Sequence, residues 1–379
     1  MKKITILLIS FFLIQAYNAN ALITSAKQAI LMDVNSGQVL FKKNENEKIS
    51  PASITKVMTS IIAFDLIKSG ELKLNEKFLV SNKAWRMAKQ GYSSMFIVPN
   101  DRITVLNLLK GIIIASGNDA CIALAEGIAG SEAAFASMMN DKAKSIGMTN
   151  TNFSNSSGIY SEDNYSTVSD ISLMSVYLIK EFPELYKMYA ERTFTWDRTG
   201  GNPITQSNRN TLLYKNSKVD GIKTGHLNDS GYSLAATMLV NNRRILSVVS
   251  GTNSQKERAK ESLKLLNHAI ITTELLLVKK ENPLFSINTW NGKKSSIKLE
   301  LEKDLYITYS KRRSRDIKMY LEVSEPIKDH FKASDQLGVL RIKDENGLDI
   351  KQPLFATEDF KKINFIKRFF NSIGFLVWG

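Results

Sequence analysis

Residues 219–250 read VDGIKTGHLNDSGYSLAATMLVNNRRILSVVS, a stretch in which three apolar runs are separated by short polar segments. We predict strands over 219–224, 232–240 and 244–250, with Asn241-Asn242 as the turn between the last two. Strands this close along a chain usually pair as neighbours in one sheet. A helix is predicted next, over 256–277.

Two more strands are predicted near the start of the chain, over 28–33 and 37–42, with Asn35-Ser36-Gly37 as a hairpin turn. Between the two sets of strands, apolar residues recur at helical spacing in 53–67, 105–114, 120–129, 131–145 and 168–181. This order predicts an α+β domain, an antiparallel sheet flanked by helices.

The later part of the chain has a different pattern. Apolar and polar residues alternate in three runs, at Ile297, Leu299 and Leu301, at Leu305, Ile307 and Tyr309, and at Ile317, Met319, Leu321 and Val323. We therefore predict a small all-β domain. The chain has 379 residues, more than one typical core accommodates, so at least two domains are expected. The predicted boundaries are 22–280, 281–355 and 356–379.

The tail is a candidate for a membrane-surface helix. At about 100° per residue, the following apolar side chains share one face of a helix: Ile363, Phe365, Ile366, Phe369, Phe370, Ile373, Leu376 and Val377. Lys362 is the charged exception on this face. The opposite face carries Lys361, Asn364, Lys367, Arg368 and Asn371. A basic, Phe-rich amphipathic helix is typical of one lying in the membrane interface, and the alternative is a helix docked on its own protein.

The first 21 residues resemble an export signal. Met1-Lys2-Lys3 precedes the apolar run 4–14, and Ala19-Asn20-Ala21 fits a cleavage site. The run is shorter than the roughly 20 residues that span a bilayer, although an uncleaved anchor is the alternative. We predict cleavage after Ala21 and an exported protein at the periplasmic face of the cytoplasmic membrane.

Charge and composition narrow the partners. The formal net charge is +14, which favours anionic partners, but export argues against nucleic acid. The single cysteine, Cys121, cannot form an intrachain disulfide and is predicted to be a buried thiol. The histidines are scattered, with no HExxH or CxxC spacing, so we predict no metal site and no cofactor.

Three short motifs occur in order: Ser53-Ile54-Thr55-Lys56, Ser116-Gly117-Asn118 and Lys223-Thr224-Gly225. None is specific alone, because 295–298, 286–288 and 68–70 also fit the three patterns. Structural context separates the sets. Ser295 and Lys298 fall in a strand-like run, where they would point to opposite faces.

Ser53 is predicted to open a helix, which places Lys56 one turn on and on the same face. A serine hydroxyl becomes a nucleophile when a base accepts its proton, and a desolvated lysine of lowered pKa can be that base. Lys223 could help to lower the pKa. The alternative role of Ser53 is that of a helix N-cap.

The other two motifs fit a binding cleft. Ser116 and Asn118 lie between two predicted helices, where a loop would present a hydroxyl and an amide, or serve only as a turn. Lys223-Thr224-Gly225 ends a predicted strand, and Gly225 would permit close approach of an extended ligand.

The chain resembles the low-molecular-mass penicillin-binding proteins, the serine D-alanyl-D-alanine carboxypeptidases. The resemblance is carried by PASITK (51–56), SGNDAC (116–121) and VDGIKTGH (219–226), with GYSSMF (91–96) and NRN (208–210) in support. It covers nearly the whole mature chain and implies a β-lactamase/transpeptidase-like domain, followed by the small β domain and the amphipathic helix.

The resemblance also implies roles for the residues in the motifs. Ser53 would attack the carbonyl between the last two D-alanines of a peptidoglycan pentapeptide, with Lys56 as general base and Ser116 relaying the proton. Substrate binding would fall to Asn118, Arg209, Lys223, Thr224, Gly225 and His226, and the backbone N–H groups of Ser53 and His226 would form the oxyanion hole. A β-lactam would acylate Ser53.

Three rival functions compete with this interpretation: a β-lactamase, a DD-endopeptidase and a non-catalytic wall sensor. A class A β-lactamase needs a glutamate in an ExxxN arrangement after the middle motif. No such spacing occurs over 131–189. A DD-endopeptidase that cuts cross-links would use the same residues and stays open, and a non-catalytic wall sensor is disfavoured by the intact Ser53, Lys56 and Lys223.

Overall fold

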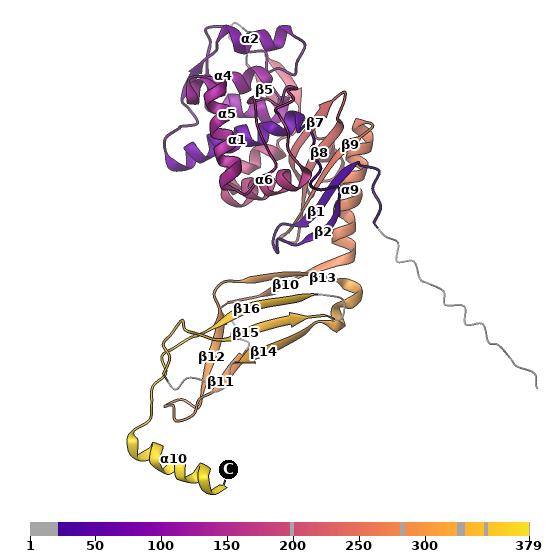
Figure 1. The fold of residues 1–379 in the computed structure, drawn as a ribbon. Coiled ribbons are helices and arrows are strands. Elements are labelled where there is room, and N and C mark those ends of the chain that lie inside the picture. The colour runs from indigo at the N-terminus through magenta and orange to yellow at the C-terminus, as the bar shows by residue number, and fades with distance from the viewer. Residues whose placement is uncertain (1–21, 198–200, 281–284, 324–329, 345–347, 379) are drawn as a thin grey trace, which may run out of the picture.

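Figure 1 shows the fold in a computed structural model, which describes residues 22–197, 201–280, 285–323, 330–344 and 348–378. The predicted signal segment, 1–21, lies outside the described residues. Two β-sheet units follow one another along the chain, with helices gathered around the first, and a separate helix lies at the C-terminal end (Figure 1).

The first unit is built on a five-stranded antiparallel sheet of order β2-β1-β9-β8-β7. Its strands are β1 (Gln28–Asp33), β2 (Val39–Lys43), β7 (Val219–Leu227), β8 (Gly231–Val240) and β9 (Arg243–Thr252). The first and last parts of this unit thus meet in one sheet, as predicted, because β1 pairs with β9. Strand β7, which carries the third motif, is an edge strand of the sheet.

Helices cover both faces of this sheet (Figure 1). On one face, α9 (Gln255–Thr272) buries Leu265 and Leu266 against Leu31 and Val249. On the other, a helical block packs its apolar residues into one large core. That block comprises α1 (Thr55–Ser69), α2 (Asn82–Lys89), α3 (Val105–Lys110), α4 (Asn118–Ala129), α5 (Glu132–Ser145), α6 (Val168–Glu181) and α7 (Pro183–Tyr186). The short helix α8 (Leu212–Lys215) instead buries Leu212 and Leu213 in the core on the α9 side.

Short elements complete the block. They are the 3₁₀ turns η1 (Ala52–Ile54) and η3 (Lys187–Ala190), the π-helical turn η2 (Gly111–Ala115), and two small hairpins, β3 (Lys77–Leu79) with β4 (Arg102–Thr104) and β5 (Thr193–Trp196) with β6 (Ile204–Ser207). Helix α1 ends at Gly70, whose φ of +84° is the left-handed conformation expected of a C-terminal glycine. The K[ST]G-like residues 68–70 are therefore a helix end, as predicted.

One predicted helix was too long. The helix expected over 256–277 ends at Thr272, and residues Thr273–Val278 form strand β10. The physical reason is the pattern of the last segment, in which β10 pairs in full register with β13 (Leu305–Ser310). Pairing with a strand that follows 27 residues later in the chain overrides local helical propensity.

The second unit is all β, as predicted. Its main sheet has the order β11-β12-β16-β15-β14, beside the β10–β13 pair. The strands are β11 (Phe285–Asn288), β12 (Ser296–Leu301), β14 (Lys318–Val323), β15 (Gln336–Lys343) and β16 (Asp349–Ala356), and η4 (Lys311–Asp316) joins β13 to β14. Inward side chains such as Leu299, Ile307 and Leu340 form a core of their own.

The tail is helical from Phe365 to Trp378 (α10). The predicted helix is therefore present, but Lys361, Ile363 and Asn364, which were predicted to lie on its faces, precede it. It lies at the end of the molecule away from the first unit (Figure 1). Among the described residues, no helix is long and apolar enough to cross a membrane.

Candidate active site

The nucleophile candidate lies at the junction of η1 and α1. Ser53 is half-buried in η1, and Lys56 follows in the first turn of α1 with only 1% of its surface exposed. Lys56 Nζ lies 3.0 Å from Ser53 Oγ and 2.6 Å from the carbonyl oxygen of Ser157. The predicted pairing of Ser53 with Lys56 is thus present, and the carbonyl is a further partner that the sequence did not reveal.

The middle motif lies between η2 and α4, as a break between two helices. Ser116 has a φ of +60°, which turns the chain sharply before α4 begins at Asn118. The backbone N–H of Asn118 donates to the carbonyl of Ser93 at 2.8 Å. Asn118 Oδ1 is buried and has no hydrogen-bond partner among the residues that the structure describes, so it is available to a bound amide.

The third motif brings a second lysine to the same place. Lys223 is 2% exposed, and its Nζ lies 3.0 Å from Ser116 Oγ. Gly225, two residues on, packs so closely against η1 that an added Cβ would lie 2.9 Å from the Pro51 carbonyl oxygen. The structure therefore brings all three motifs together, although they are far apart in the sequence.

Both lysines have a pKa below the ordinary lysine value. Burial lowers the pKa of Lys56 below its ordinary value of 10.5, against smaller opposing effects of Cys121 and Asp119. Burial also holds the pKa of Lys223 well below that value, and the charge of Lys56 adds to the effect. Burial is thus the main cause for both lysines, and the expected help of Lys223 in lowering the pKa of Lys56 stays a prediction.

Arg209 is the predicted binding residue that lies outside the three motifs. Arg209 is exposed between two buried asparagines, and its charge acts on Lys223. Asn208 Nδ2 donates to the Glu191 carbonyl at 3.0 Å and Asn210 Nδ2 to the Gly221 carbonyl at 2.9 Å. These anchors explain how an exposed arginine is kept beside β7.

At the end of the third motif, Thr224 is buried, whereas His226 is exposed. The His226 ring stacks on Tyr232 with centroids 3.9 Å apart. The guanidinium of Arg258, on α9, donates to the carbonyl of Gly225 at 2.9 Å. Arg258 is 5% exposed, and its burial lowers its pKa to about 10.

Sequence reasoning missed the buried acid behind the middle motif. The carboxylate of Asp119 accepts hydrogen bonds from the Ser94 hydroxyl and from the backbone N–H groups of Met95, Phe96, Ile97 and Ala120. It thereby ties the 91–97 segment to the start of α4. The quoted SGNDAC and GYSSMF segments contain both partners, but only the fold shows that they touch.

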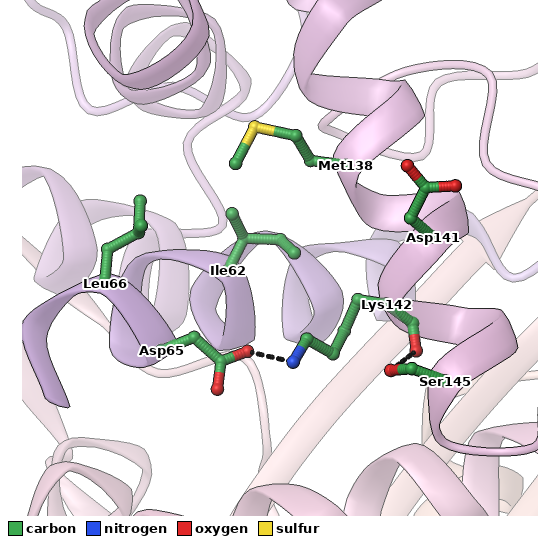
Figure 2. A pocket seen from close by; sticks show the side chains of 7 residues that line it. All are labelled: Ile62, Asp65, Leu66, Met138, Asp141, Lys142 and Ser145. Atoms are coloured by element: carbon green, nitrogen blue, oxygen red, sulfur yellow. Dashed lines mark hydrogen bonds and ion pairs between the residues drawn. The ribbon is translucent and has the colours of Figure 1, made fainter. Parts of the chain in front are cut away.

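Metal binding, the single thiol and the hollow of Figure 2 are separate from this site. No group of His, Cys, Asp or Glu among them is arranged to hold a metal ion. Cys121 is buried as predicted, and burial raises the pKa of its thiol to about 12. A hollow of about 330 Å³ lies between α1 and α5, where Asp65 pairs with Lys142 at 2.8 Å (Figure 2); it contains none of the motif residues.

Comparison with known proteins agrees with this geometry. A family model described as D-alanyl-D-alanine carboxypeptidase matches residues 15–254, and one described as the C-terminal domain of penicillin-binding protein 5 matches residues 273–362. The chain belongs to the D-alanyl-D-alanine carboxypeptidase family. It has the activity of a serine D-alanyl-D-alanine carboxypeptidase, a hydrolase.

Individual members of the family align over most of the chain. D-alanyl-D-alanine carboxypeptidase DacC of Escherichia coli K12 is 36% identical, over 90% of this chain and 86% of its own length. The structure of penicillin-binding protein 5 from Haemophilus influenzae has a TM-score of 0.81 and 32% identity, covering 89% of this chain and 98% of that one. Penicillin-binding protein D2 of Listeria monocytogenes, in the ampicillin-bound form, has a TM-score of 0.58 and 28% identity and covers 65% and 97% of the two chains.

Proposed function

We propose that the chain trims the terminal D-alanine from peptidoglycan pentapeptide stems through an acyl-enzyme on Ser53. The observation that carries this proposal is the convergence of Lys56, Ser116 and Lys223 around Ser53. Neutral Lys56 accepts the hydroxyl proton as Ser53 attacks the carbonyl between the two D-alanines. The free D-alanine leaves, and water then hydrolyses the ester bond to Ser53.

Substrate recognition is assigned to the surroundings of β7. As an edge strand, β7 is able to pair with an extended peptide, and the missing side chain of Gly225 lets the strand lie directly against η1, which carries Ser53. Arg209 supplies the positive charge for the terminal carboxylate, which also accepts hydrogen bonds from Lys223 and Thr224, and Asn118 binds the substrate amide. The backbone N–H groups of Ser53 and His226 stabilise the oxyanion.

The proposal is tested by measuring free D-alanine released from a pentapeptide that ends in D-Ala-D-Ala. Ser53→Ala should abolish release while the thermal unfolding midpoint stays near that of the wild type. The matched control is Ser295→Ala, because Ser295 occupies the SxxK pattern beside β12 and should be dispensable. Release by Ser53→Ala would overturn the assignment, and a folded wild type that releases none would favour a DD-endopeptidase or a sensor.

The same site should bind β-lactams, as penicillin-binding protein D2 does in its ampicillin-bound form. A β-lactam presents a strained amide and a carboxylate in the positions of the D-Ala-D-Ala end, so Ser53 would open the ring and stay acylated. Mass spectrometry after incubation with penicillin should show one added molecule on wild type and none on Ser53→Ala.

We also propose export by residues 1–21 and attachment to the outer face of the cytoplasmic membrane by α10. In support, the apolar side chains of Phe365, Ile366, Phe369, Phe370 and Ile373 are between 41% and 75% exposed, so the described part of the chain leaves much of their surface open. A basic helix with an exposed apolar face partitions into an anionic membrane interface. The division 22–280, 281–355 and 356–379 stays a prediction, and the pairing of β10 with β13 favours a first boundary near 272.

Truncation before Phe360 tests the anchor. The truncated enzyme should lose binding to vesicles that contain anionic phospholipid but keep its D-alanine release in solution. Phe369→Asp with Phe370→Asp should reproduce the loss in the full chain, whereas Asn371→Asp, on the polar face, should bind almost as well as wild type. Undiminished vesicle binding by the truncated form would exclude α10 as the anchor.

A further inference from the structure

The carbonyl of Ser157 controls how Lys56 faces Ser53. A neutral lysine amine has two N–H donors and a single lone pair, so a hydrogen bond from one N–H restricts where the lone pair points. Lys56 Nζ donates to Ser157 O at 2.6 Å and lies 3.0 Å from Ser53 Oγ. The position of this carbonyl therefore decides whether the lone pair meets the hydroxyl proton.

Ser156, the residue before Ser157, is fully buried, and its carbonyl, its backbone N–H and its hydroxyl all form hydrogen bonds. Its carbonyl accepts from Thr59 Oγ1 of α1 at 2.5 Å. Its backbone N–H and its hydroxyl donate to the same oxygen, Oε1 of Glu132 on α5, at 3.2 and 2.8 Å. The segment is thus held between the helix that carries Lys56 and the helix that carries Glu132.

Glu132 is the charged partner in this arrangement, and hydrogen bonds to an ionised group are stronger than neutral ones. Its other oxygen pairs with Lys83 of α2 at 2.8 Å, and the Glu132 side chain is 14% exposed. Burial disfavours its charge, but the bonds from Lys83 and Ser156 prevail and keep the pKa of Glu132 below its usual value. Neutral contacts, such as the pair of bonds between Asn140 and Phe153, hold the rest of the segment.

We infer that Glu132 is a positioning residue for the general base, which acts through Ser156 to hold the Ser157 carbonyl against Lys56. The inference rests on the role proposed for Lys56 and assigns a role to a residue outside the three motifs. Loss of the carboxylate would leave the N–H and the hydroxyl of Ser156 without their acceptor, let the Ser157 carbonyl move and leave the lone pair of Lys56 without a fixed direction.

The test compares Glu132→Ala, Glu132→Gln and wild type in the full-length enzyme, by the rate of acylation with a fluorescent penicillin between about pH 5 and 10. We expect Glu132→Ala to acylate at least tenfold more slowly and to shift the acid limb of the pH profile. Glu132→Gln keeps an acceptor oxygen for Ser156 and should stay within about threefold of wild type, with the same limb. The variants leave in place the groups that face Lys56, namely Asp119, Cys121 and Lys223.

Asp65→Ala is the matched control, because Asp65 of α1 also pairs with a lysine of another helix at 2.8 Å, Lys142 of α5, in the hollow of Figure 2. It should lower the thermal midpoint without moving the acid limb. The inference is overturned if Glu132→Ala keeps the wild-type rate and limb, or if Asp65→Ala produces the same change. Lys56→Ala is measured in the same assay. If Lys56→Ala is acylated at the wild-type rate, the assignment of Lys56 as the base is wrong. If Lys56→Ala is inactive and Glu132→Ala is normal, only the role of Glu132 is ruled out.

Discussion

Two buried lysines meet at one site, and their burial has consequences for both activity and stability. Lys56 and Lys223 are each at least 98% buried, and both have a pKa below the ordinary lysine value. A lowered pKa increases the fraction of neutral amine, the form that a general base requires. The same desolvation opposes folding, because the unfolded chain solvates the ammonium groups fully.

The pH dependence of stability follows from the sign of these shifts. Between the lowered folded pKa of Lys223 and the ordinary value of 10.5, the unfolded state holds a proton that the folded state has lost. The free energy of unfolding should therefore rise with pH in this window, by up to about 1.4 kcal/mol per pH unit for each lysine. Lys223→Met should reduce that rise.

Thermal unfolding at a series of pH values between about 7 and 10 measures this slope. Lys73→Met is the control, because Lys73 is exposed and solvated in both states, and it should leave the slope unchanged. A Lys223→Met slope equal to that of the wild type would show that Lys223 keeps its proton throughout the window.

At the scale of elements, the sequence predicts regular structure well and close contacts between elements poorly. Strand 28–33 and helix 168–181 are confirmed residue for residue, since each has a clear apolar period and a turn or cap beside it. The helix predicted over 256–277 was too long, because its last residues form β10, which pairs with the later strand β13. The segment 153–158 has no periodicity at all, so its contact with Lys56 could not be predicted.

That segment makes a close approach at Gly158, which yields a prediction. Gly158 has a φ of +76°, and an added Cβ would lie 1.8 Å from the carbonyl oxygen of Ala52, next to Ser53. Gly158→Ala should therefore displace either the segment or η1 and lower the penicillin acylation rate more than tenfold. Gly147→Ala is the control, because Gly147 has a φ of +84° and no atom within 4 Å of the added Cβ.

Both substitutions carry the penalty of an alanine in the left-handed region, about 1–2 kcal/mol. Only Gly158→Ala adds the collision, so the difference between the two variants isolates it. Equal acylation rates in the two would mean that η1 and the segment adjust without disturbing Ser53.

At the scale of the whole molecule, the motifs identified the site, but the arrangement of the two sheet units needed the structure. A polar network joins them around Asp33, which is fully buried at the end of β1. Asp33 Oδ2 accepts from Arg243 Nε at 2.7 Å and from Thr308 Oγ1 of β13 at 2.8 Å. Asp33, Arg243 and Thr308 belong to no motif and no shared period, so the sequence gives no sign that they meet.

Arg243 also fixes the point where the chain passes from one unit to the other. Its guanidinium donates to the carbonyl and the hydroxyl of Thr273, the first residue of β10, at 2.7 and 2.6 Å. Arg243→Met would leave the carboxylate of Asp33 buried without its cation, and breaking a buried ion pair in this way typically costs about 3–5 kcal/mol. We expect a large fall in the free energy of unfolding and faster proteolytic cleavage near residues 272–273.

Arg341→Met removes an arginine whose partner Asp349 is much more exposed, and it should change both measurements far less. If the two variants behave alike, the network is not what holds the second unit in place, and the β10–β13 pairing must do so by itself.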